Sequence, residues 1–432
     1  FWSSIDNDTS KDLDQIEWAE RVDGGIRVQV AIADVAAAVA KDSPLDLHAK
    51  AQTQTVYTAV RNFPMLPVQL STDLTSLNQD VDRAALVTEY VVDAQGNLTG
   101  QTIYRAEVRN KAQLAYSKVG PWLEGKGPAD AKVAASAELQ AQLRLQDEVA
   151  QALRTRRVAD GALEFFRVES DPVVVNGKVQ SIHEAPQNRA TQLIEEFMIS
   201  ANKTMAETLR VAGRSCIRRV VRAPERWDRI MALAAQHGVT LPPAPDSKAL
   251  NELLSGLRKS DPVHYQDAAL TVIKLMGPGE YVVVAANDPD PLGHFGLAAK
   301  DYAHSTAPNR RFADLVTQRL IGAMIDGVPA PYSDAELGAI AQQCNLQEKA
   351  SRKVERLMQK REAAVALAGS VGTTFHGVVT GASDKGTYVR VFNPPVEGRV
   401  VRGEQGLDVG DTVNVTLMDT NPQMGFIDFA KA

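Results

Sequence analysis

The hydrophobic pattern of this chain changes near residue 369, and the change divides it into two kinds of fold. Up to about residue 368, segments with helical spacing of apolar residues are interleaved with segments that alternate apolar and polar residues. Beyond it, valines and aromatics alternate with polar residues, and glycines recur at short intervals up to Gly425. The first pattern predicts a large mixed α/β (α+β) domain, and the second predicts a small closed all-β barrel.

Local signals place the elements within this division. Alternating residues on both sides of Asp23-Gly24-Gly25 predict a hairpin. Further strands are expected from about residue 86 to 108, with a second turn at residues 93–97. A helical stretch is expected after Asp34, to about Tyr57, and further helices over 136–157, 189–211, 224–237, 247–258, 309–326 and 333–367. We therefore predict a domain over residues 1–330, a helical extension over 331–368 and a barrel over 369–432.

Composition narrows the class of protein. A chain of 432 residues with 44% hydrophobic residues can bury large cores, and its net charge of −6 leaves room for local basic patches. Its two cysteines, Cys216 and Cys344, lie far apart, which favours a reducing, cytoplasmic setting, and no apolar run is long enough for a membrane helix. We expect a monomer. Because the chain begins with Phe1, we also expect a preceding segment in the natural protein.

An acidic cluster near the start of the chain predicts a metal site. Asp6, Asp12 and Asp14 lie six and two residues apart among Asn, Thr and Ser, which favour turns. One loop could therefore direct all three carboxylates to a common point, where a hard divalent ion such as Mg²⁺ would bind them. On spacing alone a solvated acidic turn or a weak calcium loop is the favoured alternative, although the glycine and glutamate of a calcium loop are missing.

Aromatic and basic residues are interleaved in the barrel segment. Such a mixture on one face would stack bases and hold phosphates. The alternative is that half of the aromatics belong to the barrel core, with Phe375 or Phe392 inside and Tyr388 or His376 outside. The residues concerned are Phe375, His376, Tyr388, Phe392, Lys385, Arg390, Arg399 and Arg402.

The order of short motifs resembles the catalytic domain of the RNase II and RNase R exoribonucleases, the RNB family. The tail resembles the OB-fold RNA-binding domain of the ribosomal S-one type. After the acidic loop, the motifs are Val30-Ala31-Ile32-Ala33-Asp34, Pro64-Met65-Leu66-Pro67, Leu70-Ser71, Leu74, Ser76-Leu77, Gly161-Ala162-Leu163, Glu195-Glu196-Phe197-Met198, Ala201-Asn202 and the run from Tyr302 to Phe312. In the tail they are 372–379, 386–391, Glu397-Gly398 and Val409-Gly410-Asp411.

This resemblance implies processive 3′ to 5′ hydrolysis of single-stranded RNA to nucleoside 5′-monophosphates with Mg²⁺, or with Mn²⁺ in its place. By motif position, Asp6 and Asp12 resemble metal ligands, and Asp14 resembles the carboxylate most essential for the reaction. Arg310 falls where the family places an arginine on the scissile phosphate. The resemblance therefore assigns catalytic roles to Asp14, Arg310 and Asp12.

One position departs from the family pattern. The family has a further aspartate directly after the position of Asp14, where this chain has Gln15. A glutamine carbonyl can ligate a metal but adds no charge, so we expect weaker metal binding at this site. Asp8 is a weak candidate to take its place, because in an extended loop it points away from residues at odd spacing.

The resemblance also suggests residues that hold the RNA. Tyr57 and Phe165 fall where the family stacks aromatics on the 3′-terminal bases, although Phe165, which has Phe166 beside it, fits core packing equally well. Glu195 resembles a nucleotide-contacting carboxylate, with Glu196 as the competing assignment. Tyr388 is the stacking candidate in the barrel. The basic helix face that includes Arg352 and Lys353 is interpreted as a solvated surface.

Two further function classes stay open at this stage. The Gln15 departure allows a noncatalytic RNA-binding protein on the same scaffold. A metal-dependent phosphatase for small molecules would fit the carboxylates but leaves the barrel unexplained. Whether structured RNA would be degraded depends on channel width and on the segment that precedes Phe1.

Overall fold

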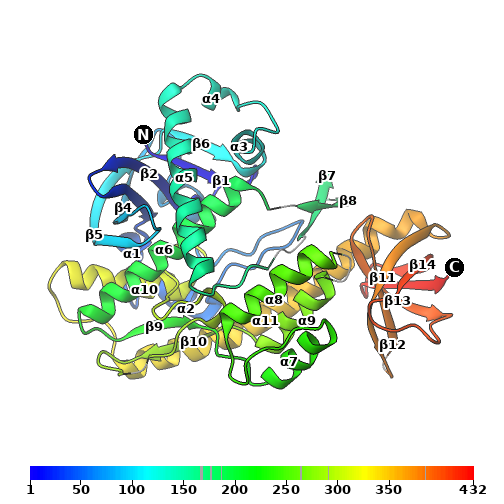
Figure 1. Ribbon diagram of the computed structural model, residues 1–432. Helices are drawn as coiled ribbons and strands as arrows, with labels where there is room; N and C mark the ends of the chain where they lie inside the picture. Colours follow the sequence, from blue (N-terminus) through cyan, green and yellow to red (C-terminus); the bar gives the residue numbers. More distant parts are fainter. Residues whose placement is uncertain (166–168, 176–177, 186, 263–264, 290, 385) are drawn as a thin grey trace.

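The computed structural model describes residues 1–165, 169–175, 178–185, 187–262, 265–289, 291–384 and 386–432 (Figure 1). A six-stranded sheet in the order β5-β4-β3-β2-β1-β6 forms the centre of the N-terminal part. Its strands are β1 (Ser3–Asp6), β2 (Gln15–Val22), β3 (Gly25–Ala33), β4 (Asp82–Val92), β5 (Leu98–Arg109) and β6 (Ala112–Ala115). All neighbours are antiparallel except β1 and β6.

The predicted hairpins are confirmed. Strands β2 and β3 pair from Gln15 opposite Ile32 to Val22 opposite Gly25, around a turn in which Gly24 has φ +90°. This left-handed conformation suits glycine, which has no Cβ to clash. Strands β4 and β5 form the second predicted hairpin. The buried core of the domain includes Val28, Val30 and Ile32 of β3.

Long helices cover the sheet. Helix α5 (Ala137–Ala159) contacts β2 and packs against α6 (Arg189–Val211), which contacts β4 (Figure 1). Asn188 caps α6, because its side chain accepts hydrogen bonds from the backbone N–H groups of Ala190 and Thr191. The apolar stripe of α6, which includes Met205, is buried. The short helices α3 (Tyr116–Leu123) and α4 (Ala131–Ala134) precede α5.

The helical stretch expected between Asp34 and about Tyr57 is interrupted, and it ends earlier than predicted. The chain forms α1 (Val35–Ala38) and α2 (Pro44–Gln52), because Val39 is extended and a new helix starts with Ser43 as its cap and Pro44 at its first position. Proline lacks the N–H that continuing the first helix would need. Helix α10 (Phe312–Ile325) packs against α1, and a π-helical turn covers Leu70–Leu74.

A separate group of helices has its own hydrophobic core. It contains α7 (Trp227–Gln236), α8 (Ser247–Ser260) and α9 (Tyr265–Met276), whose buried residues include Trp227, Leu254 and Val272. The first two were predicted; α9 was not. Next to them, β9 (Cys216–Val220) pairs with β10 (Glu280–Val284), and a 3-10 turn covers Phe295–Leu297. A hairpin of β7 (Glu169–Val175) and β8 (Lys178–Ala185) lies nearer the barrel in Figure 1.

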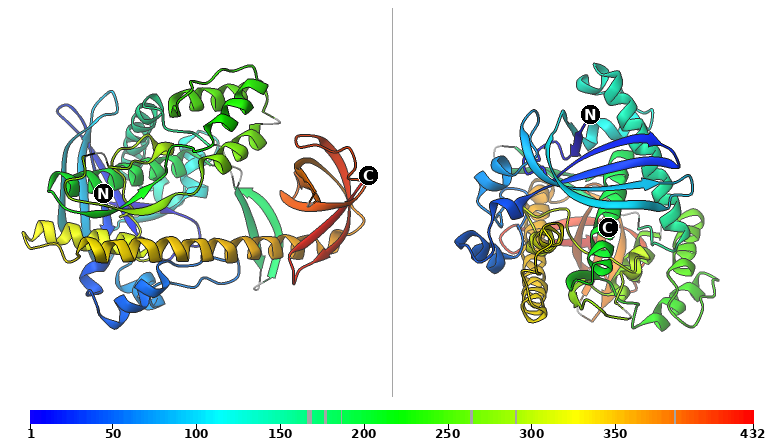
Figure 2. Two further views of the ribbon diagram at one scale, coloured as in Figure 1. Left: turned by 90° about the horizontal axis from the view of Figure 1, so that it is seen from below. Right: turned by 90° about the vertical axis from the view of Figure 1, so that its left-hand side faces the viewer.

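One long helix joins the two parts of the molecule. Helix α11 (Asp334–Leu367) runs from the large domain to the barrel, as Figure 2 shows, and a 3-10 turn over Ala368–Ser370 follows it. Its last turns, at Ala364 and Leu367, share a hydrophobic cluster with Phe429 of the barrel. The five strands β11 (Thr374–Ser383), β12 (Gly386–Val391), β13 (Val396–Arg402), β14 (Thr412–Asn421) and β15 (Phe426–Lys431) close in the order β11-β12-β13-β15-β14. This confirms the predicted fold class.

Two simpler expectations concern the cysteines and the membrane. Cys216 and Cys344 are both buried and free, the first in β9 and the second in α11. Within the part of the chain that the structure describes, no helix has both the length and the apolar character needed to cross a bilayer.

Candidate active site

The acidic loop connects β1 to β2, and hydrogen bonds between its backbone and a neighbouring segment hold it in place. Asp6 ends β1 and Gln15 begins β2, while Leu13 between them is fully buried. The backbone N–H of Leu13 donates to the hydroxyl of Ser76 at 2.9 Å, and the Leu13 carbonyl accepts from Leu77 N–H at 3.0 Å. The Ser76-Leu77 motif therefore holds the loop in place.

The two carboxylates in the first half of the loop, those of Asp6 and Asp8, have different hydrogen-bond partners. Asp6 accepts hydrogen bonds from the backbone N–H of Asn7 at 2.7 Å and from the hydroxyl of Ser10 at 2.8 Å. Burial raises the pKa of Asp6, although these two hydrogen bonds oppose the shift. Asp8 instead accepts from the hydroxyl of Ser117 at 2.8 Å, so its carboxylate has a partner outside the loop.

Asp14 and Arg310 form the central ion pair of the site. The Arg310 Nε donates to Asp14 Oδ2 at 2.9 Å, and the Asp14 side chain is only 3% exposed. Burial raises the pKa of Asp14 to about 6, and the charge of Arg310 opposes that shift. The other oxygen, Oδ1, is buried and has no hydrogen-bond partner among the described residues. An unpartnered buried carboxylate oxygen is costly unless it binds a cation or a donor.

The segment that carries Arg310 is held by buried polar contacts. Asn202 of α6 accepts from both the backbone N–H and the hydroxyl of Ser305, at 2.8 and 2.7 Å. On the other side of the turn, Thr75 donates its hydroxyl to Asn309 at 2.8 Å. These contacts connect the Ala201-Asn202 motif and the Tyr302 to Phe312 run, which explains why the two occur together.

The residue after Arg310 anchors the end of the segment. Arg311 donates through Nε and one terminal nitrogen to both carboxylate oxygens of Asp314, at 2.8 and 2.7 Å. Asp314 also accepts from the backbone N–H of Ala307 at 2.8 Å. Arg311 is therefore occupied by the fold, which leaves the half-exposed Arg310 as the arginine of this turn that points to the acidic loop.

Tyr57 reaches the same site from a third segment. Its hydroxyl donates to Asp12 Oδ2 at 3.1 Å, and 39% of the residue is exposed. The backbone places it there, because Thr55 N–H donates to the carbonyl of Arg310 at 3.0 Å. Burial raises the pKa of Tyr57, so the phenol keeps its proton and acts as a donor. Tyr57, Asp12, Asp14 and Arg310 thus converge from distant parts of the sequence.

Gln15 is the first residue of β2 and directly follows Asp14. It is 7% exposed, and its Nε2 lies 3.5 Å from the carbonyl of Ile5, a long contact. Because side chains alternate along a strand, Gln15 and Glu17 lie on the same face of β2. The same register buries Glu17 completely, and neither of its carboxylate oxygens has a partner among the described residues.

Sequence reasoning missed Glu17. Burial raises its pKa well above the ordinary value, and the nearby charge of Asp6 adds to the shift. The signal was available: Glu17 lies two residues after Gln15, in the register of β2 that faces the protein interior.

The acidic cluster fits a hard divalent cation by chemistry. The charge of Asp12 raises the pKa of Asp6 and that of Asp14, and Asp14 Oδ1 has no hydrogen-bond partner among the described residues. Among the described residues, however, no group of three or more His, Cys, Asp or Glu side chains is arranged to hold a metal ion. The metal-ligand roles of Asp6, Asp12, Asp14 and Gln15 stay predictions.

The other candidates for RNA contact in the large domain, Glu195 and Phe165, contact residues outside this group. Glu196 is buried against Arg157, whose Nε donates to its carboxylate oxygens at 3.0 and 3.2 Å. Glu195 is exposed and lies 3.7 Å from Arg157, and partial burial raises its pKa. Phe165 packs, partly buried, against the core of helices α7 to α9, which is the core-packing alternative; Phe166 lies outside the described residues.

The aromatic residues of the barrel lie partly in its core and partly on its surface. Phe375 packs edge-to-face on buried Phe429 with ring centroids 6.2 Å apart. Phe392 and Tyr388 are 45% and 37% exposed, and the ring of exposed His376 lies 5.6 Å from that of Phe392. Arg399 is directly opposite Tyr388 on the next strand, while Lys385 lies outside the described residues. An exposed aromatic surface with a nearby cation is therefore present on the barrel.

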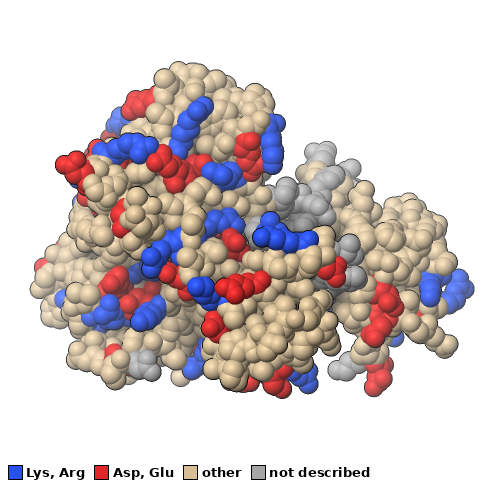
Figure 3. Space-filling model, viewed as in Figure 1, with Lys and Arg blue, Asp and Glu red and all other residues tan. Residues whose placement is uncertain are grey.

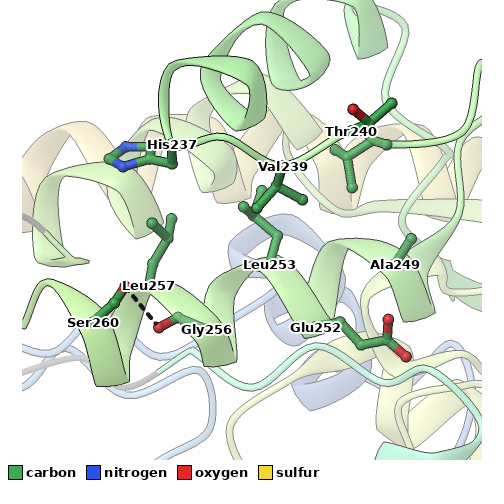
Figure 4. Close-up of a pocket in the computed structure, with 10 residues that line it drawn as sticks. His237, Val239, Thr240, Ala249, Glu252, Leu253, Gly256, Leu257 and Ser260 are labelled. Carbon is green, nitrogen blue, oxygen red and sulfur yellow. Dashed lines mark hydrogen bonds between the residues drawn. The ribbon is translucent and has the colours of Figure 1, made fainter.

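Surface features elsewhere do not compete with this site. Figure 3 shows basic and acidic side chains interspersed over the face that it presents, rather than one continuous basic surface. A hollow of about 380 Å³ between α8 and the segment that follows α7 is lined by His237, Val239, Leu253 and Leu257 among others (Figure 4). None of the residues assigned above to a site lies there, and its lining is largely the outer side of the α7 to α9 core.

Comparison with known proteins identifies the family. The model of the RNB domain matches residues 1–327, and that of the RNase II-type exonuclease C-terminal S1 domain matches residues 373–432. The chain is 30% identical over 415 residues to ribonuclease R of Escherichia coli (strain K12) and 29% identical over 410 residues to that of Mycoplasma pneumoniae. These matches cover 92% of the chain and 50% and 55% of the two relatives, so the chain spans about half of their length.

Solved structures agree on the fold. The structure of Mycoplasma genitalium RNase R in complex with ribose-methylated single-stranded RNA matches with a TM-score of 0.89 and 24% identity, covering 100% of this chain and 70% of that one. Yeast Ssd1, described as a pseudonuclease, matches with a TM-score of 0.69 and 17% identity, over 92% of this chain and 50% of that one. The family model that covers residues 1–327, together with the curated relatives, shows that this chain belongs to the RNB family of ribonucleases.

Proposed function

We propose that the protein is a hydrolytic exoribonuclease that degrades single-stranded RNA processively from the 3′ end to nucleoside 5′-monophosphates. The observation that carries the proposal is the convergence of Asp14, Arg310, Asp12 and Tyr57 through hydrogen bonds of 2.9 and 3.1 Å. A carboxylate with a free oxygen beside a half-exposed guanidinium suits the hydrolysis of a phosphodiester.

In this mechanism the guanidinium of Arg310 contacts the scissile phosphate and stabilises the charge that develops on its nonbridging oxygens. Asp14 positions Arg310 before RNA arrives. Tyr57 stacks on a base near the 3′ end, with its hydroxyl held by Asp12 so that the ring keeps one orientation. Exposed Glu195 contacts the nucleotide, as the family pattern suggests.

Asp6, Asp12 and Asp14 would hold Mg²⁺, or Mn²⁺ in its place, with Gln15 as a neutral fourth candidate. When bound, such an ion supplies Lewis-acid stabilisation and a water of lowered pKa. The carboxylate-rich donor set and the unpartnered Asp14 Oδ1 support this choice. Because this chain has Gln15 where the family pattern has an aspartate, its site carries one negative charge fewer than that pattern.

The barrel extends the RNA-binding surface. Tyr388, with Arg399 opposite it and with Phe392 and His376 also exposed, offers stacking faces for bases. The relatives named ribonuclease R, and the solved RNase R complex with single-stranded RNA, support this substrate class. A monomeric state, a cytoplasmic location and the division at residues 330 and 368 stay predictions.

A noncatalytic RNA-binding protein is the alternative. Gln15 in place of an aspartate favours it, as does the likeness in fold to a pseudonuclease. Asp14 and Arg310, both present and paired, favour the enzyme.

Incubation of the protein with 5′-labelled oligo(A) separates the two functions. With Mg²⁺ or Mn²⁺ we expect short limit products without intermediates, no cleavage in EDTA, and poor cleavage of the matching DNA, because DNA lacks the 2′-hydroxyl. RNA that stays intact under all metal conditions while binding tightly would establish the noncatalytic alternative.

A further inference from the structure

A second pocket lies on the large domain, apart from the acidic loop. It has a volume of about 380 Å³, within the range of roughly 300–1,000 Å³ that is usual for small-molecule sites. Its walls come from three segments: the loop between β9 and α7, the stretch from the end of α9 to the start of β10, and the middle of α11. None of the residues assigned to RNA or metal lines it.

The charge of this pocket is opposite to that of the whole chain. Three acidic residues line it, Glu225, Glu280 and Glu348, so its five basic residues leave a net charge of +2 (5 − 3), against −6 for the protein. The basic residues are Arg222, Arg226, Lys274, Lys349 and Arg352.

Only part of this positive charge is balanced within the protein. Arg222 pairs with Glu280 at 2.5 Å, and Arg352 pairs with Glu348 at 2.6 Å. Arg226, Lys274 and Lys349 have no ion pair among the described residues, and all three are exposed. A group with about two negative charges would complement the three unpaired cations.

We propose that this pocket binds a phosphate monoester of mononucleotide size. A phosphate monoester carries about −1.5 to −2 charges at neutral pH and has three strong acceptor oxygens, which matches the excess charge and the donors of the pocket. The apolar side chains of Leu275, Met276 and Pro278 line the same hollow and offer a surface for the rest of the molecule.

The pocket is joined to the segment that carries Arg310. Glu348, in its wall, also accepts from both terminal nitrogens of buried Arg219 at 2.8 Å, and the Arg219 guanidinium lies 4.7 Å from the centre of the Tyr281 ring. The Tyr281 hydroxyl is hydrogen-bonded to His304 Nδ1 at 2.8 Å, six residues before Arg310.

The backbone and a glycine tighten this connection. Asn345, another wall residue, accepts from the backbone N–H of Tyr281 at 2.7 Å and donates to its carbonyl at 2.8 Å. A Cβ at Gly279 would lie 2.9 to 3.1 Å from the guanidinium of Arg219, so only glycine lets that cation sit as it does. An anion that draws Arg352 from Glu348 therefore acts on a network that positions the Arg310 segment.

The binding test uses the full chain and three probes: inorganic phosphate, adenosine 5′-monophosphate and adenosine. Titration calorimetry in EDTA should show binding of the monophosphate, weaker binding of phosphate, and no binding of adenosine. The double variant Lys274→Ala/Lys349→Ala should weaken monophosphate binding about tenfold or more, the effect expected for lost charge-assisted contacts. Thermal melting of each variant checks that it is folded.

Two controls locate the site. Lys353→Ala removes an exposed lysine one turn further along α11 that does not line the pocket, and should bind as the parent does. Arg310→Ala should also keep the affinity, because the proposed pocket is not the catalytic site. No binding by the parent, an equal loss in Lys353→Ala, or a loss confined to Arg310→Ala would each overturn the proposal.

The source of the phosphate and its consequence are measured separately. A further probe is a single-stranded oligonucleotide without a terminal phosphate. If it binds more tightly than the monophosphate and its binding is weakened equally by Lys274→Ala/Lys349→Ala, the pocket is an RNA contact and the proposal is overturned. The effect on rate rests on the proposed ribonuclease function: adding the monophosphate should change RNA degradation more in the parent than in the double variant. Equal effects in both would remove the coupling, while the binding measurement stands regardless of activity.

Discussion

The guanidinium of Arg310 donates to the carboxylate of Asp14 at 2.9 Å, although 296 positions separate the two residues in the sequence. Neither segment holds the pair alone: the acidic loop is fixed by Ser76 and Leu77, and the arginine turn by Asn202 and Thr75. The pair therefore forms only when the domain packs both segments in their correct positions. It also concentrates the chemistry of the site on two side chains that can be changed singly.

Replacing Asp14 with asparagine should lower the cleavage rate by about 10²–10³-fold or more while RNA affinity stays nearly unchanged. The change removes charge needed in the transition state rather than uniform binding of substrate. Single-turnover digestion of labelled RNA and a filter-binding assay measure the two quantities. Asp8→Asn is the matched control, since Asp8 lies in the same loop but bonds Ser117, and it should behave as the parent. A near-parent rate for Asp14→Asn would show that the acidic loop is not the catalytic centre.

Replacing Gln15 with aspartate should lower the Mg²⁺ concentration needed for half-maximal rate and for half-saturation in calorimetry. The new carboxylate adds charge beside Asp14, where the family pattern has an aspartate. Gln15→Asn is the control, because it shortens the side chain without adding charge. If both variants titrate as the parent does, position 15 does not contact the ion.

Replacing Tyr57 with alanine should leave a longer limit product. Stacking of a base on an aromatic ring is worth about 1–3 kcal/mol, which matters most when few nucleotides remain bound. Tyr57→Phe keeps the ring and removes only the hydrogen bond to Asp12, so it should stop near the parent length. An end-point gel of 5′-labelled RNA measures this. Identical limit products for all three proteins would argue against stacking at Tyr57.

Replacing Tyr388 with alanine should weaken binding of long RNA more than it slows hydrolysis of a bound short one. Deleting residues 369–432 is a poorer test, because Ala364 and Leu367 of α11 pack into the barrel core and would become exposed. Met418→Ala, an exposed apolar residue on β14, is the control for a general change of the barrel surface. Affinity measured at several salt concentrations should fall with salt in every variant, since phosphate contacts release counterions. Unchanged affinity in Tyr388→Ala would exclude that ring as a stacking face.

The buried histidines predict an acid dependence of stability. Burial lowers the pKa of His294 to about 4 and that of His304 well below its ordinary value of 6.5. The unfolded chain therefore binds more protons below pH 6.5, so these groups lower the free energy of unfolding as pH falls from about 6.5 to 4, each by at most about 1.4 kcal/mol per pH unit.

His294→Asn isolates one of these contributions. Asparagine also caps a helical turn well, as His294 Nδ1 does by accepting from Leu297 N–H at 3.1 Å, but it does not titrate in this range. Urea unfolding followed by tryptophan fluorescence should show the parent losing stability relative to the variant between pH 6.5 and 4. Parallel curves over that window would mean that His294 does not titrate as its burial implies.

The sequence by itself determined the element pattern wherever local physics was decisive. Three features follow from rules that act over a few residues of chain. They are the hairpin turn at Asp23-Gly24-Gly25, the helix cap at Asn188 and the 34-residue amphipathic helix α11. Where a local rule was overlooked, the prediction failed: Pro44 divided the expected helix into α1 and α2. The barrel followed from its period-two pattern and its spaced glycines.

Only the tertiary structure decided which polar side chains meet. Spacing within the acidic loop indicates a cluster, but it does not reveal that Arg310 pairs with Asp14, that Tyr57 holds Asp12, or that Arg157 occupies Glu196 and leaves Glu195 exposed. These partners are far apart in sequence, and their contacts depend on the packing of the sheet, α6 and α10 rather than on propensity. Long-range packing also buries Glu17, whose carboxylate has no partner among the described residues, and builds the basic pocket from three separate segments. Burial and charge balance belong to the folded chain as a whole.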